Sequence, residues 1–237
     1  MNLLATLPFR AGRAAVRHVR RAWRARPSSE VFDAWATDGR AATMESAHGP
    51  VVRPLIDHLD LAPDAWFLDL GCGNGYAVRW AAARLPEGRA VGIDASPEMI
   101  QRARELSRDN PRVEFHEASF PQHPLTRRSF DAIFSMETVY YFPDLPAALA
   151  EVRRLLKPGG GFLCAVDYYR ENPDSHCWPE YVGARMKLLD AKGWRRAFET
   201  AGFAAVRQER LVVPKEDAVE PWHATVGSLV TTGRNPA

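Results

Sequence analysis

Acidic residues end two short apolar runs of this 237-residue chain, and glycines follow the first of them. Residues 66–75 read WFLDLGCGNG, so Asp69 closes an apolar run and is followed by three glycines at alternate positions, Gly71, Gly73 and Gly75. Glycines allow a sharp turn and a close approach of a ligand to the backbone. Asp94 closes the second run, and a carboxylate about 20 residues beyond such a turn accepts hydrogen bonds from ribose hydroxyls in nucleotide-binding units. The spacing therefore predicts a nucleoside-containing ligand.

The turn does not match a phosphate-binding loop. The dinucleotide fingerprint G-x-G-x-x-G would need a glycine where Tyr76 stands, and the chain lacks the Gly-Lys-Ser/Thr of a P-loop. A carboxylate at Asp69 would also repel a pyrophosphate, since like charges disfavour each other at short range. A cationic ligand, or one with an ammonium group, suits this position better.

The stretch D-L-G-C-G-N-G, residues 69–75, resembles motif I of the class I S-adenosylmethionine (SAM) dependent methyltransferases. SAM carries a sulfonium, an ammonium, a carboxylate and an adenosine, and no phosphate. The resemblance covers residues 50–170 and includes the L-K-P-G-G turn at 156–160. It implies an α/β, Rossmann-like doubly wound fold, with a seven-stranded, mostly parallel sheet and an antiparallel C-terminal strand.

The resemblance also implies which residues hold SAM. Three positions depart from the family: Ser119 stands where the family has an adenine-binding aspartate, and Tyr140 and Tyr141 replace a pair of histidines. A general base expected at those histidines is therefore absent. The residues expected to bind the cofactor are Asp69, Gly71, Cys72, Gly73, Gly75, Asp94, Ala95, Met99, Ser119, Phe120, Ser135 and Met136.

Methyl transfer from a sulfonium is an in-line displacement on an activated donor, so the protein mainly aligns the acceptor with the methyl group. A base is needed only where the acceptor is poorly nucleophilic. The candidates for that role are Tyr141, Asp167 and His176. No metal is expected, because His176-Cys177 has no second pair at metal-ligand spacing.

The expected domain covers residues 30–237. Residues 30–61 are expected to form lid helices, with breaks at Gly39 and near Gly49-Pro50, and residues 170–192 are expected to cap the acceptor pocket. Two final strands are expected at 211–213 and 224–230. The aromatic residues at helical spacing after the cap favour core packing; they are Trp194, Phe198 and Phe203.

The first 29 residues contain seven arginines and no acid, and six of these arginines, all but Arg26, fall on one side of a helical wheel. This basic amphipathic leader predicts peripheral contact with an anionic membrane through residues 1–26. A helix packed on its own domain and a transit peptide are the alternatives. The rest of the chain has more acidic than basic residues, which disfavours a nucleic-acid partner.

The function expected from the resemblance is methylation of a small-molecule or lipid-like acceptor at oxygen, nitrogen, sulfur or carbon. The alternatives are a non-catalytic SAM-binding protein, another enzyme on this fold, and a methyltransferase acting on protein or nucleic acid. The three cysteines show no disulfide framework, which favours a cytoplasmic location, and no apolar stretch approaches the roughly 20 residues of a membrane span.

Overall fold

One seven-stranded sheet forms the centre of the protein, in a computed structural model that describes residues 25–236. Its spatial order is β3-β2-β1-β4-β5-β7-β6. The strands are β1 (Trp66–Leu70), β2 (Arg89–Asp94), β3 (Val113–Glu117), β4 (Phe130–Met136), β5 (Leu156–Val166), β6 (Ala204–Leu211) and β7 (Ser228–Arg234). The first five pair in parallel, and β7 pairs antiparallel with both β5 and β6. The predicted sheet is confirmed.

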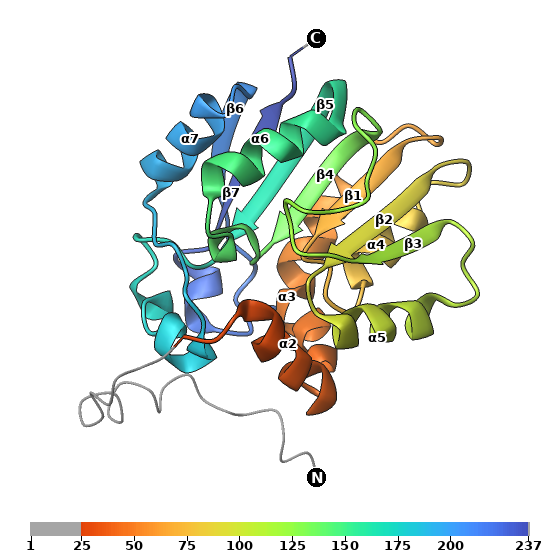
Figure 1. Cartoon of the computed structure of the whole chain (residues 1–237). Helices are drawn as coiled ribbons and strands as arrows, with labels where there is room; N and C mark the ends of the chain where they lie inside the picture. Colours follow the sequence, from red (N-terminus) through yellow and green to blue (C-terminus); the bar gives the residue numbers. More distant parts are fainter. Residues whose placement is uncertain (1–24, 237) are drawn as a thin grey trace.

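Helices cover both faces of this sheet (Figure 1). One face carries α6 (Leu145–Leu155) and α7 (Ala191–Thr200), and the other carries α3 (Arg40–Asp57), α4 (Tyr76–Ala82) and α5 (Pro97–Ser107). The helix starts follow from local chemistry, because α5 and α6 begin at capping side chains. The Ser96 hydroxyl accepts a hydrogen bond from the Met99 N–H at 3.1 Å, and the Asp144 carboxylate accepts one from the Ala147 N–H at 3.0 Å.

The aromatic residues after the cap segment lie in the core, as predicted. Trp194, Phe198 and Phe203 are all buried. The Phe198 ring stacks on Phe162 of β5, with centroids 5.1 Å apart. These contacts attach α7 to the sheet and leave the three rings unavailable to a ligand.

Two expectations about the ends of the domain were wrong in detail. The break at Gly39 is present, between α2 (Ser28–Thr37) and α3, but α3 continues through Pro50. Its apolar residues from Val51 onward pack in the core, which favours the helix despite the proline. The last two strands are β6 and β7, and not the predicted 211–213 and 224–230. The β6 strand lies at the sheet edge, where alternating polar residues leave no apolar run to indicate a strand.

The segments that lie between the main elements gather at the carboxyl edge of the parallel strands (Figure 1). They are α2, the short helices η2 (Val139–Tyr141), η3 (Pro173–Ser175) and η5 (Pro221–Ala224), and one π-helical turn, η4 (Pro179–Gly183). In open parallel sheets, ligands bind at this edge.

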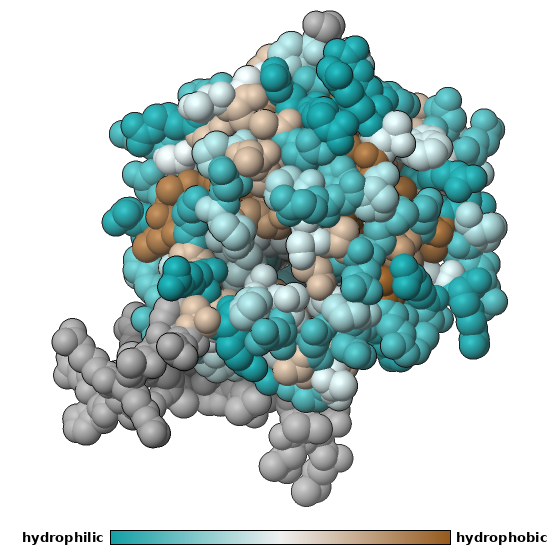
Figure 2. Space-filling model, in the orientation of Figure 1, coloured by the Kyte–Doolittle hydropathy of each residue, from teal (hydrophilic) through white to brown (hydrophobic). Residues whose placement is uncertain are grey.

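Hydrophilic atoms predominate on the face in Figure 2, where apolar atoms form separate groups. No helix within residues 25–236 is long and apolar enough to cross a membrane. Most of the proposed basic leader, residues 1–24, lies outside the described residues, so its membrane contact stays a prediction.

Candidate active site

A cavity of about 320 Å³ opens at the carboxyl edge of the sheet. One part of its wall comes from the glycine turn and the end of β2, and includes Gly71, Gly73 and Asp94. The other part lies beneath α2, α3, η4 and η5. The two parts form one continuous space, as a reaction between two bound molecules requires.

Two acids stand at the strand ends beside the first part of the cavity: Asp94 lines it, and Asp69 is buried outside the lining. Asp69 is 4% exposed, and its carboxylate makes no hydrogen bond within residues 25–236. Burial raises the pKa of Asp69 well above its usual value, and the nearby negative charge of Asp94 raises it further. Asp94 accepts hydrogen bonds from the Gly73 and Ser96 N–H groups, each at 2.9 Å. A buried carboxylate without a partner fits a ligand that carries an ammonium group.

The three glycines of the turn differ in the space that a side chain would find beside them. A side chain at Gly71 would begin 2.1 Å from the Thr138 hydroxyl oxygen, and one at Gly75 would begin 2.6 Å from the Phe115 ring. Those two glycines therefore allow the turn to pack. At Gly73, by contrast, the nearest atom would be 3.9 Å away, in Met44, so the space beside this backbone is open to the cavity.

Most of the other predicted cofactor residues also line the cavity, namely Cys72, Ala95, Met99, Phe120 and Met136. Five predicted site residues do not line it: Asp69, Gly75, Ser119, Ser135 and His176. Ser135 donates to the Leu70 carbonyl at 3.0 Å and so joins β4 to β1. His176 is exposed, and its Nε2 lies 3.1 Å from the Arg170 carbonyl oxygen.

Three side chains of the glycine turn and α4 attach α3 above the cavity. The Asn74 amide donates to the Ala41 carbonyl at 3.0 Å. The Tyr76 hydroxyl lies 3.4 Å from Nδ1 of His48, and Arg79 pairs with Glu45 at 3.4 Å. These contacts place α3 over the cofactor turn in the position of a lid.

Replacing Asn74 by alanine should loosen this lid. The change leaves the Ala41 carbonyl and the Tyr76 N–H without their side-chain partner, and a lost buried hydrogen bond costs about 1–3 kcal/mol. We expect the Kd of S-adenosylhomocysteine (SAH), the demethylated form of SAM, to rise about tenfold by isothermal titration calorimetry. Asn110→Ala is the matched control, since Asn110 also accepts from a backbone N–H but precedes β3 at the opposite edge. Equal affinity in the two variants would contradict the lid role of Asn74.

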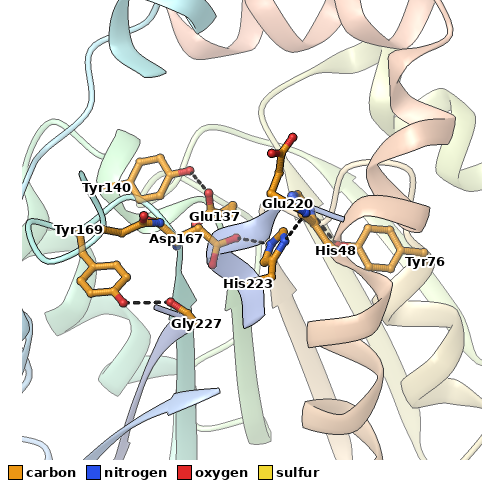
Figure 3. Close-up of polar contacts among 10 residues, drawn as sticks. His48, Tyr76, Glu137, Tyr140, Asp167, Tyr169, Glu220, His223 and Gly227 are labelled. Atoms are coloured by element: carbon orange, nitrogen blue, oxygen red, sulfur yellow. Dashed lines mark hydrogen bonds and ion pairs between the residues drawn. The ribbon is translucent and has the colours of Figure 1, made fainter. Parts of the chain in front are cut away.

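The second part of the cavity contains a pair of carboxylates, from Glu137 and Asp167 (Figure 3). Glu137 follows β4 with a φ of 56°, a left-handed conformation that is uncommon for residues other than glycine. Its carboxylate accepts a hydrogen bond from the Tyr140 hydroxyl at 2.8 Å and another from the Asp167 N–H. Burial raises the pKa of Glu137 well above its usual value, and the Asp167 charge raises it further.

Two histidines stand beside these carboxylates (Figure 3). The Glu220 N–H donates to Nδ1 of His223 at 3.1 Å, so the neutral His223 ring carries its proton on Nε2. That Nε2 lies 3.8 Å from Oδ2 of Asp167. Burial lowers the pKa of His48 on α3, which favours its neutral form at pH 7.

Of the three predicted catalytic candidates, Tyr141 and Asp167 line the cavity together. Sequence reasoning missed Glu137 and His223, and it placed His48 only within the expected lid helices of residues 30–61. Glu137 had a readable signal, because it directly follows an apolar strand, as Asp167 does. His223 had none, since it precedes the strand predicted at 224–230 and lies in η5, for which no element was predicted.

Removing the unpaired charge at Asp69 should change the pH dependence of stability. The raised pKa means that the folded protein binds a proton at Asp69 more tightly than the unfolded chain. Its stabilising contribution is therefore complete below the ordinary pKa of 3.8 and is lost as the pH rises through the folded-state value. For Asp69→Asn, we expect a higher free energy of unfolding than the unchanged protein at pH 8, with the difference shrinking towards pH 4.

Urea unfolding between pH 4 and pH 8 measures this effect. Asp60→Asn is the control, because Asp60 is exposed. A difference between Asp69→Asn and the unchanged protein that is independent of pH would contradict the assignment. SAH binding should weaken in the same variant, because the carboxylate is no longer available to the ligand.

The sheet order, the glycine turn and the acids at the strand ends define a class: α/β proteins with a binding site for a cationic nucleoside. Residues 67–160 match a family model described as a methyltransferase domain. A solved complex between the Haloferax volcanii Trm112 methyltransferase activator and its assigned methyltransferase contains a similar chain. The two chains are 34% identical, with a TM-score of 0.78, and the match covers 87% of this chain and 98% of that one.

Two similar curated proteins are also named as methyltransferases. The nocamycin O-methyltransferase of Saccharothrix syringae is 37% identical over 47% of this chain and 41% of its own length. The trans-aconitate 2-methyltransferase of Azoarcus sp. (strain BH72) is 35% identical over 73% of this chain and 65% of its own. The match spans about two fifths of the first of these relatives.

The chain belongs to the class I SAM-dependent methyltransferase family, and its cofactor is SAM. The residues of the first part of the cavity fit that cofactor. Gly73 leaves open space beside its backbone, and the carboxylate oxygens of Asp94 would accept hydrogen bonds from ribose hydroxyls. The buried carboxylate of Asp69, outside the lining, stays a prediction for the ammonium group.

Proposed function

We propose that the protein transfers the methyl group of SAM to a small-molecule acceptor that binds in the second part of the cavity. The observation that carries this proposal is the continuity of the cavity, from Gly73 and Asp94 to Tyr141 and Asp167. A cofactor held at the glycine turn would share this space with a second ligand. The family resemblance and the small-molecule substrates in the names of the relatives support the same reading.

SAM supplies a methyl group that is already activated by the sulfonium, so the main work of the chain is to orient the two molecules. The glycine turn and the strand-end acids hold the cofactor. Aromatic side chains enclose the acceptor side, and they are Phe32, Trp35, Tyr141, Phe142, Trp178, Tyr181 and Trp222. Aromatic walls also exclude water from the reacting groups.

The covering elements favour a small acceptor over a macromolecule. α2 and α3 lie over the cavity on one side, and η4 and η5 contribute Val182 and His223 on the other. An intact protein or duplex would have to displace these elements to reach Asp167, which is 1% exposed. Methylation of a protein or a nucleic acid is the alternative, and labelling of a host extract distinguishes it from methylation of a small molecule.

A lipophilic acceptor is a further part of the proposal, supported by the aromatic lining and by the basic composition of residues 1–26. Comparing how full-length protein and a 27–237 variant partition onto anionic liposomes tests the membrane contact. Equal partitioning of the two would remove it.

Incubating the protein with methyl-labelled SAM and an extract of its host tests the function. Label in small organic-soluble or polar compounds supports the proposal. Label in protein or nucleic acid favours the alternative, and retention of all label on SAM despite SAH binding favours a binding-only role. Because a similar chain is solved in complex with the Trm112 activator, the extract should contain the host's proteins, so that any required partner is present.

A further inference from the structure

Within residues 25–236, neither of the two buried carboxylates, Glu137 and Asp167, is paired with a lysine or an arginine. Asp167 is 1% exposed, and its Oδ1 has no hydrogen-bond partner within residues 25–236. Its Oδ2 has only the 3.8 Å contact with His223. A buried carboxylate oxygen without a donor is costly. A ligand that donates a hydrogen bond, or carries a positive charge, would remove this cost.

Apart from the histidines His48 and His223, the described lining of the cavity contains one basic side chain, Arg40. Arg40 is exposed and already pairs with Asp38 at 2.6 Å. His48 is held towards its neutral form by burial. Glu220 adds a third acid to the same wall. The wall therefore attracts cations and repels carboxylates and phosphates.

Aromatic rings surround this acidic wall. Tyr141 packs edge-on against Phe32, with centroids 5.5 Å apart, and Trp222 packs edge-on against Trp178 at 6.1 Å. All four line the cavity. Aromatic faces attract cations through the ring quadrupole, and they also bind apolar groups. Together, rings and carboxylates fit a molecule with an apolar body and a positively charged nitrogen.

We propose that the acceptor is a basic amine, recognised as its ammonium form by Glu137 and Asp167. This inference rests on the proposed function and names its substrate class. The ammonium donates N–H groups to the free Oδ1 of Asp167 and to the Glu137 carboxylate. Glu137 is held for this purpose by Tyr140 and by the Asp167 N–H.

The proposed reaction conserves atoms and charge. An N–H proton of the ammonium passes to the Glu137 carboxylate, which leaves a neutral amine with a free electron pair. The amine nitrogen then forms a bond to the methyl carbon while the S–C bond breaks. The electron pair of the broken bond stays on sulfur, which becomes a neutral thioether. The product is a methylated ammonium, and Glu137 returns its proton to solvent.

Three probes of matched shape and different charge test this recognition: 2-phenylethylamine, 2-phenylethanol and phenylacetate. Their affinities are measured by isothermal titration calorimetry at pH 7.5, on protein saturated with SAH, so that the readout does not depend on turnover. We expect the amine to bind at least about tenfold more tightly than the alcohol, and phenylacetate to bind weakest.

Glu137→Gln should remove at least about tenfold of the amine affinity and leave the alcohol unchanged, because one charged hydrogen bond becomes neutral. Asp167→Asn gives a second measurement if the first variant does not fold. Glu117→Gln is the control, since Glu117 ends the neighbouring edge strand β3 and lies outside the cavity lining.

Tighter or equal binding of the alcohol or the carboxylate overturns the inference. So does an unchanged amine preference in Glu137→Gln, or the absence of saturable binding by benzylamine, 2-phenylethylamine and 3-phenylpropylamine alike. The extract labelling separates this failure from failure of the proposed function: an O-methylated small molecule would keep the function and remove the amine. An N-methylated product would support both.

Discussion

Gly73→Val is expected to abolish measurable SAH binding while the fold persists. The valine side chain would project from the glycine turn into open cavity, where the nearest existing atom is 3.9 Å from the new Cβ. Nothing in the core has to move, so the space lost is the space that the ligand needs. The φ of +51° also places a β-branched residue in the left-handed region, at a cost of about 1–2 kcal/mol. Calorimetry of SAH binding and thermal unfolding together measure the two effects.

Gly159→Val provides a control for the backbone cost alone. Gly159 has a φ of +79° and no atom within 4 Å of an added Cβ, and it does not line the cavity. This variant should lose a similar amount of stability and keep its SAH affinity. If Gly73→Val bound SAH as tightly as Gly159→Val, the glycine turn would not be the cofactor site.

The second large effect is expected at Asp94. Asp94→Asn keeps the shape of the side chain but removes its charge, and an amide cannot accept from every donor that a carboxylate serves. Loss of charge-assisted hydrogen bonds to ribose should weaken SAH binding by about 1–3 kcal/mol, which corresponds to between several-fold and about 100-fold in Kd. Equilibrium binding of SAH is the measurement.

The control for Asp94 is again Glu117→Gln. Glu117 is the register partner of Asp94 on β3, so it ends the adjacent parallel strand, but its side chain is exposed and outside the cavity lining. Its SAH affinity should stay within the error of the unchanged protein. A loss of the same size in both variants would point to general charge at this edge instead of a contact from Asp94.

The parallel part of the fold was predictable because each of its strands is a short apolar run followed by turn or cap chemistry. Asp69, Asp94 and Asp167 were found from that pattern, and Glu137 obeys it too. The local signal is strong because parallel strands are buried on both faces.

The covering elements were less accessible to sequence reasoning. The position of His223 depends on a 3₁₀ turn for which no element was predicted, and the contact between His48 and Tyr76 joins positions 28 residues apart. The conformation of Glu137 is also set by tertiary contacts, since its N–H donates to the Ala165 carbonyl at 3.0 Å. These features arise from packing between segments that are far apart in the chain, so no local sequence pattern indicates them.

The left-handed backbone at Glu137 has a consequence for how the cavity works. Its N–H and carboxylate are bonded to residues at the end of β5, so its side chain is fixed to the sheet and not to α2 or α3. The α2 helix is attached through the Ser96 hydroxyl, which donates a hydrogen bond to Asp33, so the hydrogen bonds of Glu137 do not depend on α2. The helix that shapes the cavity from above and the carboxylate that we propose selects the ligand's charge therefore belong to separately anchored elements.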